Sequence, residues 1–222
     1  MTGVRFPSVF RVFANCCAVV CVVQSSFVQA EAQFKDPLET PALARKDVQK
    51  RPLMAITAAG KRLVAVGSRG LVIASDDQGK SWTQAQVPVQ SDLLAVNFPT
   101  AKDGWIVGHD GVILHSSDGG KKWAKQLDGR QAATSFKAFY SSLGADGVGP
   151  LAQIEQNYKA GPALPFLDVW FEDANRGFAV GSFGMLVATS DGGTTWEPWL
   201  HRMSNPQYLN LNALRGIGDD LY

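Results

Sequence analysis

Residues 63–82 read LVAVGSRGLVIASDDQGKSW, and the pattern returns as GWIVGHDGVILHSSDGGKKW at 104–123 and as GFAVGSFGMLVATSDGGTTW at 177–196. Each copy holds an apolar run, a G-x-x-G turn, a second apolar run and an acidic phrase that ends in tryptophan. Self-similarity at long intervals is the signature of repeat architectures. The repeat, more than any single motif, therefore decides the fold.

An additional apolar run precedes each copy, at 53–58, 93–98 and 166–171. Large apolar residues alternate with other residues within these runs, which are also rich in β-branched and aromatic residues. Both features are typical of strands. Each repeat therefore predicts four short strands: an inner strand, a second, a third and an outer strand.

The spacing of the repeats predicts a propeller. Asp77 and Asp118 lie 41 residues apart, whereas Asp118 and Asp191 lie 73 apart. Four strands in about 40 residues are typical of a propeller blade, and the longer interval indicates an insertion. Residues 211–222 resemble the start of a fourth blade. We therefore expect an all-β chain in which 31–222 form a partial β-propeller, seven-bladed when complete and truncated here.

The acidic phrase has the form S/T-x-D-x-G-x-x-W and falls in the turn between the third and outer strands. Its aspartate can accept hydrogen bonds from the turn's own N–H groups, and its tryptophan can be buried between blades. Three equivalent copies favour a structural role, because an active site needs one asymmetric set of groups. The predicted structural residues are Ser75, Asp77, Gly79, Trp82, Ser116, Asp118, Gly120, Trp123, Thr189, Asp191, Gly193 and Trp196.

The segment at about 128–165 breaks the strand pattern. Phe136, Phe139 and Tyr140 have the spacing of one helix face, and Pro150 can begin a second helix. The insertion therefore predicts a helical hairpin between the second and third blades.

The hairpin should share one face of the propeller with the G-x-x-G turns and with the loop at 201–207. Aromatic and arginine side chains are favoured anchors at protein interfaces. Some apolar residues of the hairpin should therefore stay exposed as a docking patch; the alternative is that the hairpin only caps the channel. The candidate partner-binding residues are Arg69, His109, Asp110, Phe183, Arg202, Phe136, Phe139 and Tyr140.

The first 30 residues predict a secretory signal peptide. A basic start is followed by an apolar run at 12–23 and by a small-x-small pattern that ends at Ala30. We expect an exported protein that does not span the membrane after cleavage. An uncleaved anchor and a lipoprotein modified at Cys21 are the alternatives. All three cysteines lie in this segment, so the mature chain has neither disulfides nor thiolate metal sites.

The remaining sequence gives little indication of chemistry. The whole sequence has a formal net charge of +1, with 21 basic and 20 acidic residues. Without Arg5 and Arg11 of the signal segment, 19 basic residues face 20 acidic ones, and this balance predicts no nucleic-acid binding. His109, His115 and His201 lack metal-ligand spacing and are interpreted as surface residues, so no metal, cofactor or catalytic residue is predicted. Asp168 replaces an alanine of the other inner strands; it could bind a ligand in the channel, or pair with an arginine or with water.

The repeated phrases resemble Asp boxes, which occur in sialidases and in many other propellers. Their combination with V-G-x-x-G turns over nearly all of 31–222 resembles the photosystem II stability/assembly factor family, a set of exported seven-bladed propellers. The resemblance implies a non-enzymatic protein that binds a protein partner and assists assembly of a membrane complex. It implies a location in the periplasm, or in the thylakoid lumen of a photosynthetic source. It also implies a partner surface that bears arginines, for which Arg69 and Arg202 qualify.

Two other classes of function stay open. A sialidase-like glycoside hydrolase would need an arginine triad and a Tyr–Glu pair. Arg51 in KRPLM is the nearest candidate for the first arginine, and no tyrosine has an assignable glutamate partner. The third class is a ligand-binding or purely structural propeller.

Overall fold

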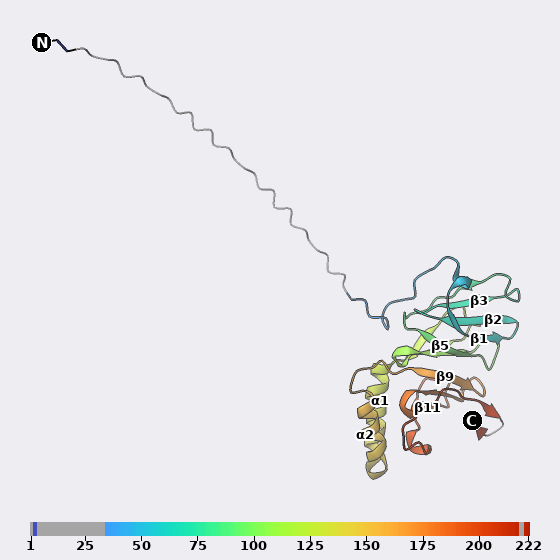
Figure 1. Cartoon of the computed structure of the whole chain (residues 1–222). Helices are drawn as coiled ribbons and strands as arrows, with labels where there is room; N and C mark the ends of the chain where they lie inside the picture. Colours follow the sequence, from blue (N-terminus) through green and yellow to red (C-terminus); the bar gives the residue numbers. More distant parts are fainter. Residues whose placement is uncertain (1, 4–33, 218–219) are drawn as a thin grey trace. The chain divides into compact units, whose positions relative to one another are not determined.

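The computed structural model describes residues 2–3, 34–217 and 220–222. The expected signal peptide, apart from residues 2–3, lies outside this part of the chain. The chain divides into units at 1–34 and 35–222, and the second unit holds every element described below (Figure 1). No helix among the described residues is long and apolar enough to cross a membrane.

Twelve strands form three antiparallel sheets of four, each in chain order. The first sheet contains β1 (Leu53–Ala59), β2 (Arg62–Gly67), β3 (Val72–Ser75) and β4 (Thr83–Gln84). The second contains β5 (Leu93–Asn97), β6 (Gly104–Gly108), β7 (Ile113–Ser116) and β8 (Ala124–Leu127). The third contains β9 (Phe166–Phe171), β10 (Gly177–Gly181), β11 (Leu186–Thr189) and β12 (Glu197–Pro198). The predicted all-β architecture of four-stranded blades is confirmed.

The blades follow one another as in a propeller. The first strand of each sheet contacts that of the next, so that β5 lies between β1 and β9 (Figure 1). Alternate side chains of the middle strands face opposite neighbours. Ile106 packs against the first blade with Trp123, whereas Trp105 packs against the third blade with Phe171 and Trp196. The second blade therefore contributes to two interblade cores.

The first glycine of each G-x-x-G turn is required by a close backbone approach. A Cβ at Gly67, Gly108 or Gly181 would collide with the carbonyl oxygen of the residue that precedes the inner strand of the same blade. A side chain at these positions would push the inner strand away from the second strand.

The acidic phrases close the turns between third and outer strands. In the second blade, Ser116 Oγ donates to Asp118 Oδ1 at 2.9 Å and accepts the N–H of Gly120 at 2.9 Å. Asp118 Oδ1 also accepts the N–H of Lys122 at 3.1 Å. The Trp123 indole N–H donates to the Gly120 carbonyl at 3.1 Å. The carboxylate is thus occupied by groups of its own turn.

The turns of the other two blades repeat this arrangement. Asp77 accepts the side-chain and backbone hydrogens of Ser81, at 2.6 and 2.8 Å, and the hydroxyl of Ser75 at 2.8 Å. These bonds lower the pKa of Asp77 to about 2. Asp191 accepts the Thr195 N–H at 2.9 Å in the same way.

The insertion between β8 and β9 contains α1 (Gly129–Ser142), the short η3 (Gly144–Gly147) and α2 (Val148–Asn157), as expected for a helical hairpin. A capping box begins α1: Asp128 Oδ1 accepts the N–H of Gln131 at 3.1 Å, and Gln131 Oε1 accepts that of Asp128 at 3.0 Å. Figure 1 shows the two helices side by side.

Several short elements complete the described chain. They are the 3-10 turns η1 (Val48–Lys50), η2 (His109–Gly111), η4 (Ser182–Gly184) and η5 (Leu200–Arg202), and the paired strands β13 (Gly216–Ile217) and β14 (Asp220–Leu221). This last strand pair falls where the sequence predicted that a fourth blade would begin.

Candidate protein-binding face

The hairpin, the turns between second and third strands, and the loop after β12 lie on one face. Gly111 of η2 packs so closely on Gly129 of α1 that a Cβ there would lie 2.8 Å from the Gly129 backbone. Residues of α2 and of the loop after β12 line a common cavity. We call this the hairpin face; it comprises residues 129–157, the turns at 68–70, 109–111 and 182–184, and the loop at 200–210.

The three turns of the hairpin face share one backbone conformation. Arg69, Asp110 and Phe183 occupy the same position in successive blades, with φ of 56°, 60° and 55°. A positive φ is uncommon outside glycine, and aspartate tolerates it better than a bulky residue does. The backbone N–H of Arg69 donates to Asp92 Oδ1 at 2.7 Å, and that of Phe183 donates to Asn210 Oδ1 at 2.8 Å. The segment before the next inner strand therefore holds these turns in place.

The candidate partner-binding residues divide by exposure. Those open to solvent are Arg69, His109, Phe183 and Arg202, while Asp110 and Phe139 are partly buried. Phe136 and Tyr140 are 0 % exposed and belong to the core between the hairpin and the second and third blades. This finding corrects the expectation that these two aromatic residues are available to a partner.

Tyr140 fastens α1 to the third blade. Its hydroxyl donates to the Pro198 carbonyl at 2.9 Å and accepts the N–H of Leu200 at 2.9 Å. His201 Nδ1 lies 3.2 Å from the same oxygen. Burial raises the pKa of Tyr140 to about 12. The hydroxyl therefore stays protonated at neutral pH and serves as a structural link.

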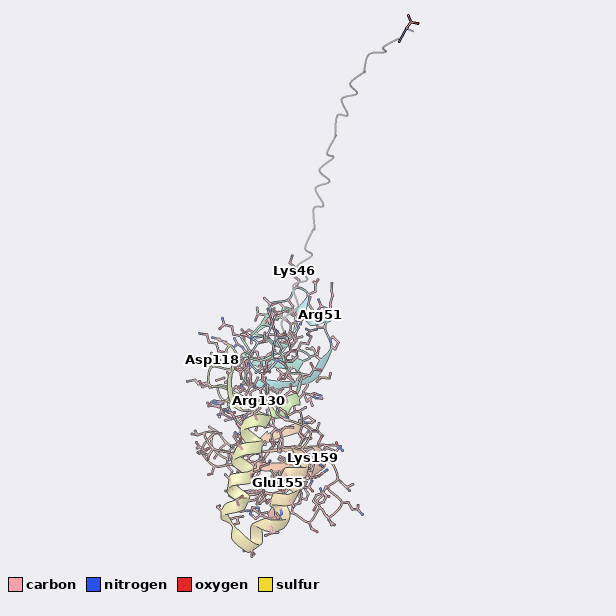
Figure 2. The ribbon with its side chains drawn as sticks, turned by 90° about the vertical axis from the view of Figure 1, so that its left-hand side faces the viewer. Lys46, Arg51, Asp118, Arg130, Glu155 and Lys159 are labelled. Atoms are coloured by element: carbon pink, nitrogen blue, oxygen red, sulfur yellow. The ribbon has the colours of Figure 1, made fainter. Side chains whose placement is uncertain are left out.

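Ion pairs connect the N-terminal end of α1 and the neighbouring Lys125 to the segment before the first blade. Lys125 Nζ lies 2.8 Å from Asp128 and 3.0 Å from Glu39, and Arg130 pairs with Asp36. Figure 2 shows Arg130 at this end of α1, with Glu155 on α2 and Lys159 in the turn that follows that helix.

Arg202 is an exposed cation that follows β12 in the chain. Its Cζ lies 4.3 Å from the centroid of the Trp199 ring, and its Nη2 lies 3.4 Å from Glu197. Stacking on an indole keeps a guanidinium oriented while it stays hydrated.

The sequence did not reveal a groove between α2 and the loop after β12. Two adjoining cavities of about 320 and 690 Å³ share Gln153 and Tyr208 as lining residues. The pair Asn205-Pro206 is a turn signal in the sequence, but no local pattern shows which helix the loop will face.

Asp168, the residue that replaces an alanine of the other inner strands, is paired within the protein. Arg215 Nη1 lies 2.7 Å from Asp168 Oδ2, which also accepts the N–H of Leu214 at 2.9 Å. Of the two interpretations of Asp168, pairing with an arginine is the one observed.

His115 is half-buried, which corrects its assignment to the surface. It stacks on Trp105 at 4.6 Å. Its Nε2 lies 3.7 Å from Asp103 Oδ1, too far for a hydrogen bond, and has no hydrogen-bond partner among the described residues. Within the described ranges, no three His, Cys, Asp or Glu side chains form a group that could hold a metal ion.

Comparison with known proteins supports the resemblance to photosystem II assembly factors. Residues 74–143 match the model of the family described as "Photosynthesis system II assembly factor YCF48". The match runs from β3 of the first blade through the second blade to the end of α1. A comparison with curated proteins gave no match.

Two solved structures match part of this chain. "YCF48 bound to D1 peptide" is 17% identical with a TM-score of 0.48, over 72% of this chain and 46% of that one. "YCF48 from Cyanidioschyzon merolae" is 23% identical with a TM-score of 0.44, over 66% of this chain and 39% of that one. The chain thus spans less than half of either structure.

Proposed function

We propose that this protein binds another protein through the hairpin face and assists assembly of a membrane complex. The observation that carries the proposal is the exposure of Arg69, His109, Phe183 and Arg202 on one face, around a hairpin whose own aromatic anchors are buried. Rigid turns that display arginine and aromatic side chains suit a protein interface. The family match at residues 74–143 supports the assembly role.

The proposal includes export and the absence of enzymatic activity. Cleavage after Ala30 would release the chain into the periplasm, or into the thylakoid lumen of a photosynthetic source. The intact mass of the exported protein tests this part: we expect an N-terminus near Glu31 and no thiol. A retained Cys16 would contradict it.

Site-specific photocrosslinking tests the binding face. A photoreactive amino acid placed at Arg69 or at Arg202 should crosslink, in membranes of the source organism, to a subunit of a membrane complex. The matched control is Lys121, which is exposed in a turn between third and outer strands and so lies at the opposite end of its blade. Equal crosslinking from Lys121, or none from either arginine position, would refute the proposal.

A further inference from the structure

The groove between α2 and the loop after β12 has a lining without charged side chains. We call it the amide groove and define it by Gln153, Gln156, Asn157, Phe183, Tyr208 and Leu209. None of the residues that line its two cavities is Asp, Glu, Lys, Arg or His. A charged group that entered would lose hydration and meet no counter-charge in the lining.

Apolar surface is exposed at the groove. Phe183, Tyr208 and Leu209 are 50 %, 48 % and 60 % exposed. Phe183 belongs to η4, whereas Tyr208 and Leu209 belong to the loop after β12, and all three line the same cavity of about 690 Å³. Exposed apolar side chains that gather in a hollow, rather than lying scattered, are typical of binding sites.

The groove is held in shape before any partner arrives. Tyr208 has a φ of 51°, and its N–H donates to the Asn205 carbonyl at 3.0 Å. The Asn205 side chain exchanges two hydrogen bonds with the Leu209 backbone, at 2.9 and 3.1 Å. Phe183, also at positive φ, is fixed through Asn210. Rigid aromatic side chains lose little conformational freedom when they bind.

The wall formed by α2 contains one amide nitrogen without a hydrogen-bond partner among the described residues. Gln153 is 8 % exposed, and its Nε2 donates to Asn157 Oδ1 at 2.6 Å. Asn157 Nδ2 is buried and has no hydrogen-bond partner among the described residues. Buried polar groups in native proteins are nearly always paired, so this donor indicates a missing acceptor.

From this combination we infer that the amide groove binds an extended, uncharged peptide segment that carries a large apolar side chain. An extended segment presents unpaired main-chain N–H and C=O groups, and a primary amide can donate to one and accept from the other. A helix would use those groups internally. The inference rests on the proposed function and specifies the chemistry of the partner.

A displayed library of random dodecapeptides, panned over the intact chain, tests the inference. We expect enriched sequences to lack net charge and to contain a large apolar residue. A fluorescent copy of an enriched peptide should bind about tenfold more weakly to the double variant Phe183→Asn/Tyr208→Asn, because both aromatic anchors are lost. Asparagine tolerates positive φ, so both turns should persist. The control variant Gln78→Asn changes another exposed residue at positive φ, in the turn between the third and outer strands of the first blade, and should bind normally.

Three results would overturn the inference: enrichment of acidic or basic peptides, no enrichment, or undiminished binding to the double variant. The crosslinking experiment separates this failure from failure of the proposed function. If Arg202 crosslinks to a partner that the double variant still binds normally, the groove inference fails while the proposed function stands. If neutral peptides bind but no partner crosslinks, the proposed function fails alone.

Discussion

Tyr140 on α1 donates a hydrogen bond to the carbonyl of Pro198 on β12, although 58 residues separate them in the chain. The same hydroxyl accepts the N–H of Leu200. One oxygen thus joins the inserted hairpin to the outer strand of the third blade.

The variant Tyr140→Phe should lower the free energy of unfolding by about 1–3 kcal/mol, because a buried carbonyl and a buried N–H lose their partner. Urea unfolding measures the change. Tyr158→Phe is the matched control: Tyr158 is buried on the same hairpin, and no hydrogen bond involves its hydroxyl within the described part of the chain. A similar loss in both variants would mean that packing, and not the hydrogen bond, anchors the hairpin.

The variant Asp118→Ala should cost about 1–3 kcal/mol, since the N–H groups of Lys121 and Lys122 lose their acceptor. Asp118→Asn retains an amide oxygen and should cost less. Denaturant melts of both variants check the order. A fully stable Asp118→Ala variant that had lost a hydrolytic activity would reverse the structural assignment.

The variant Trp123→Ala should cost about 3–5 kcal/mol, because the indole is 6 % exposed between the first and second blades. Trp82→Ala should cost less, since Trp82 is only partly buried at the outer side of the first blade. Thermal melts compare the two variants; equal losses would contradict the assignment of Trp123 to an interblade core.

Stability should fall in acid through the aspartates of the repeated turns. The pKa of Asp77 is lowered from 3.8 to about 2 by hydrogen bonds from Ser81 and Ser75. A carboxyl with a lowered folded pKa stabilises the fold above its unfolded pKa, and this contribution is lost as the pH falls toward the folded value. Between about pH 5 and about pH 2, unfolding midpoints should drop less steeply in Asp77→Asn than in the parent. If the midpoints of Asp77→Asn and of the parent fell in parallel with pH, Asp77 would not contribute to the loss of stability in acid.

His115 should add a second pH dependence closer to neutrality. Burial lowers its pKa below 6.5, and Asp103 opposes that shift only in part. The unfolded chain therefore binds the proton more readily, and stability should decrease as the pH falls below about 6.5. His115→Phe should flatten this part of the profile. Urea unfolding midpoints of the parent and of His115→Phe, measured from about pH 7 to about pH 5, test this prediction.

The sequence predicted features that repeat or that depend on near neighbours. Three copies of one phrase were enough to place the strands, the closing turns and Trp123 between blades. Helical spacing and a break in the strand pattern located the insertion.

The features that the sequence did not predict depend on distant residues. Phe136 and Tyr140 have the spacing of a helix face, but only packing against β12 shows that this face is fully buried. The amide groove forms where Gln153 of α2 meets Tyr208 of a later loop, and neither segment contains a signal for the other. The stacking of His115 on Trp105 likewise depends on the pairing of two strands.

The common backbone of the turns at Arg69, Asp110 and Phe183 has a consequence for protein engineering. A cation, an anion and an aromatic ring occupy the same geometric position on three successive blades. Their identities can be exchanged, or replaced by asparagine or glycine, without a new backbone having to be designed. The hairpin face could therefore be reprogrammed residue by residue for other binding targets while the sheets beneath it remain constant.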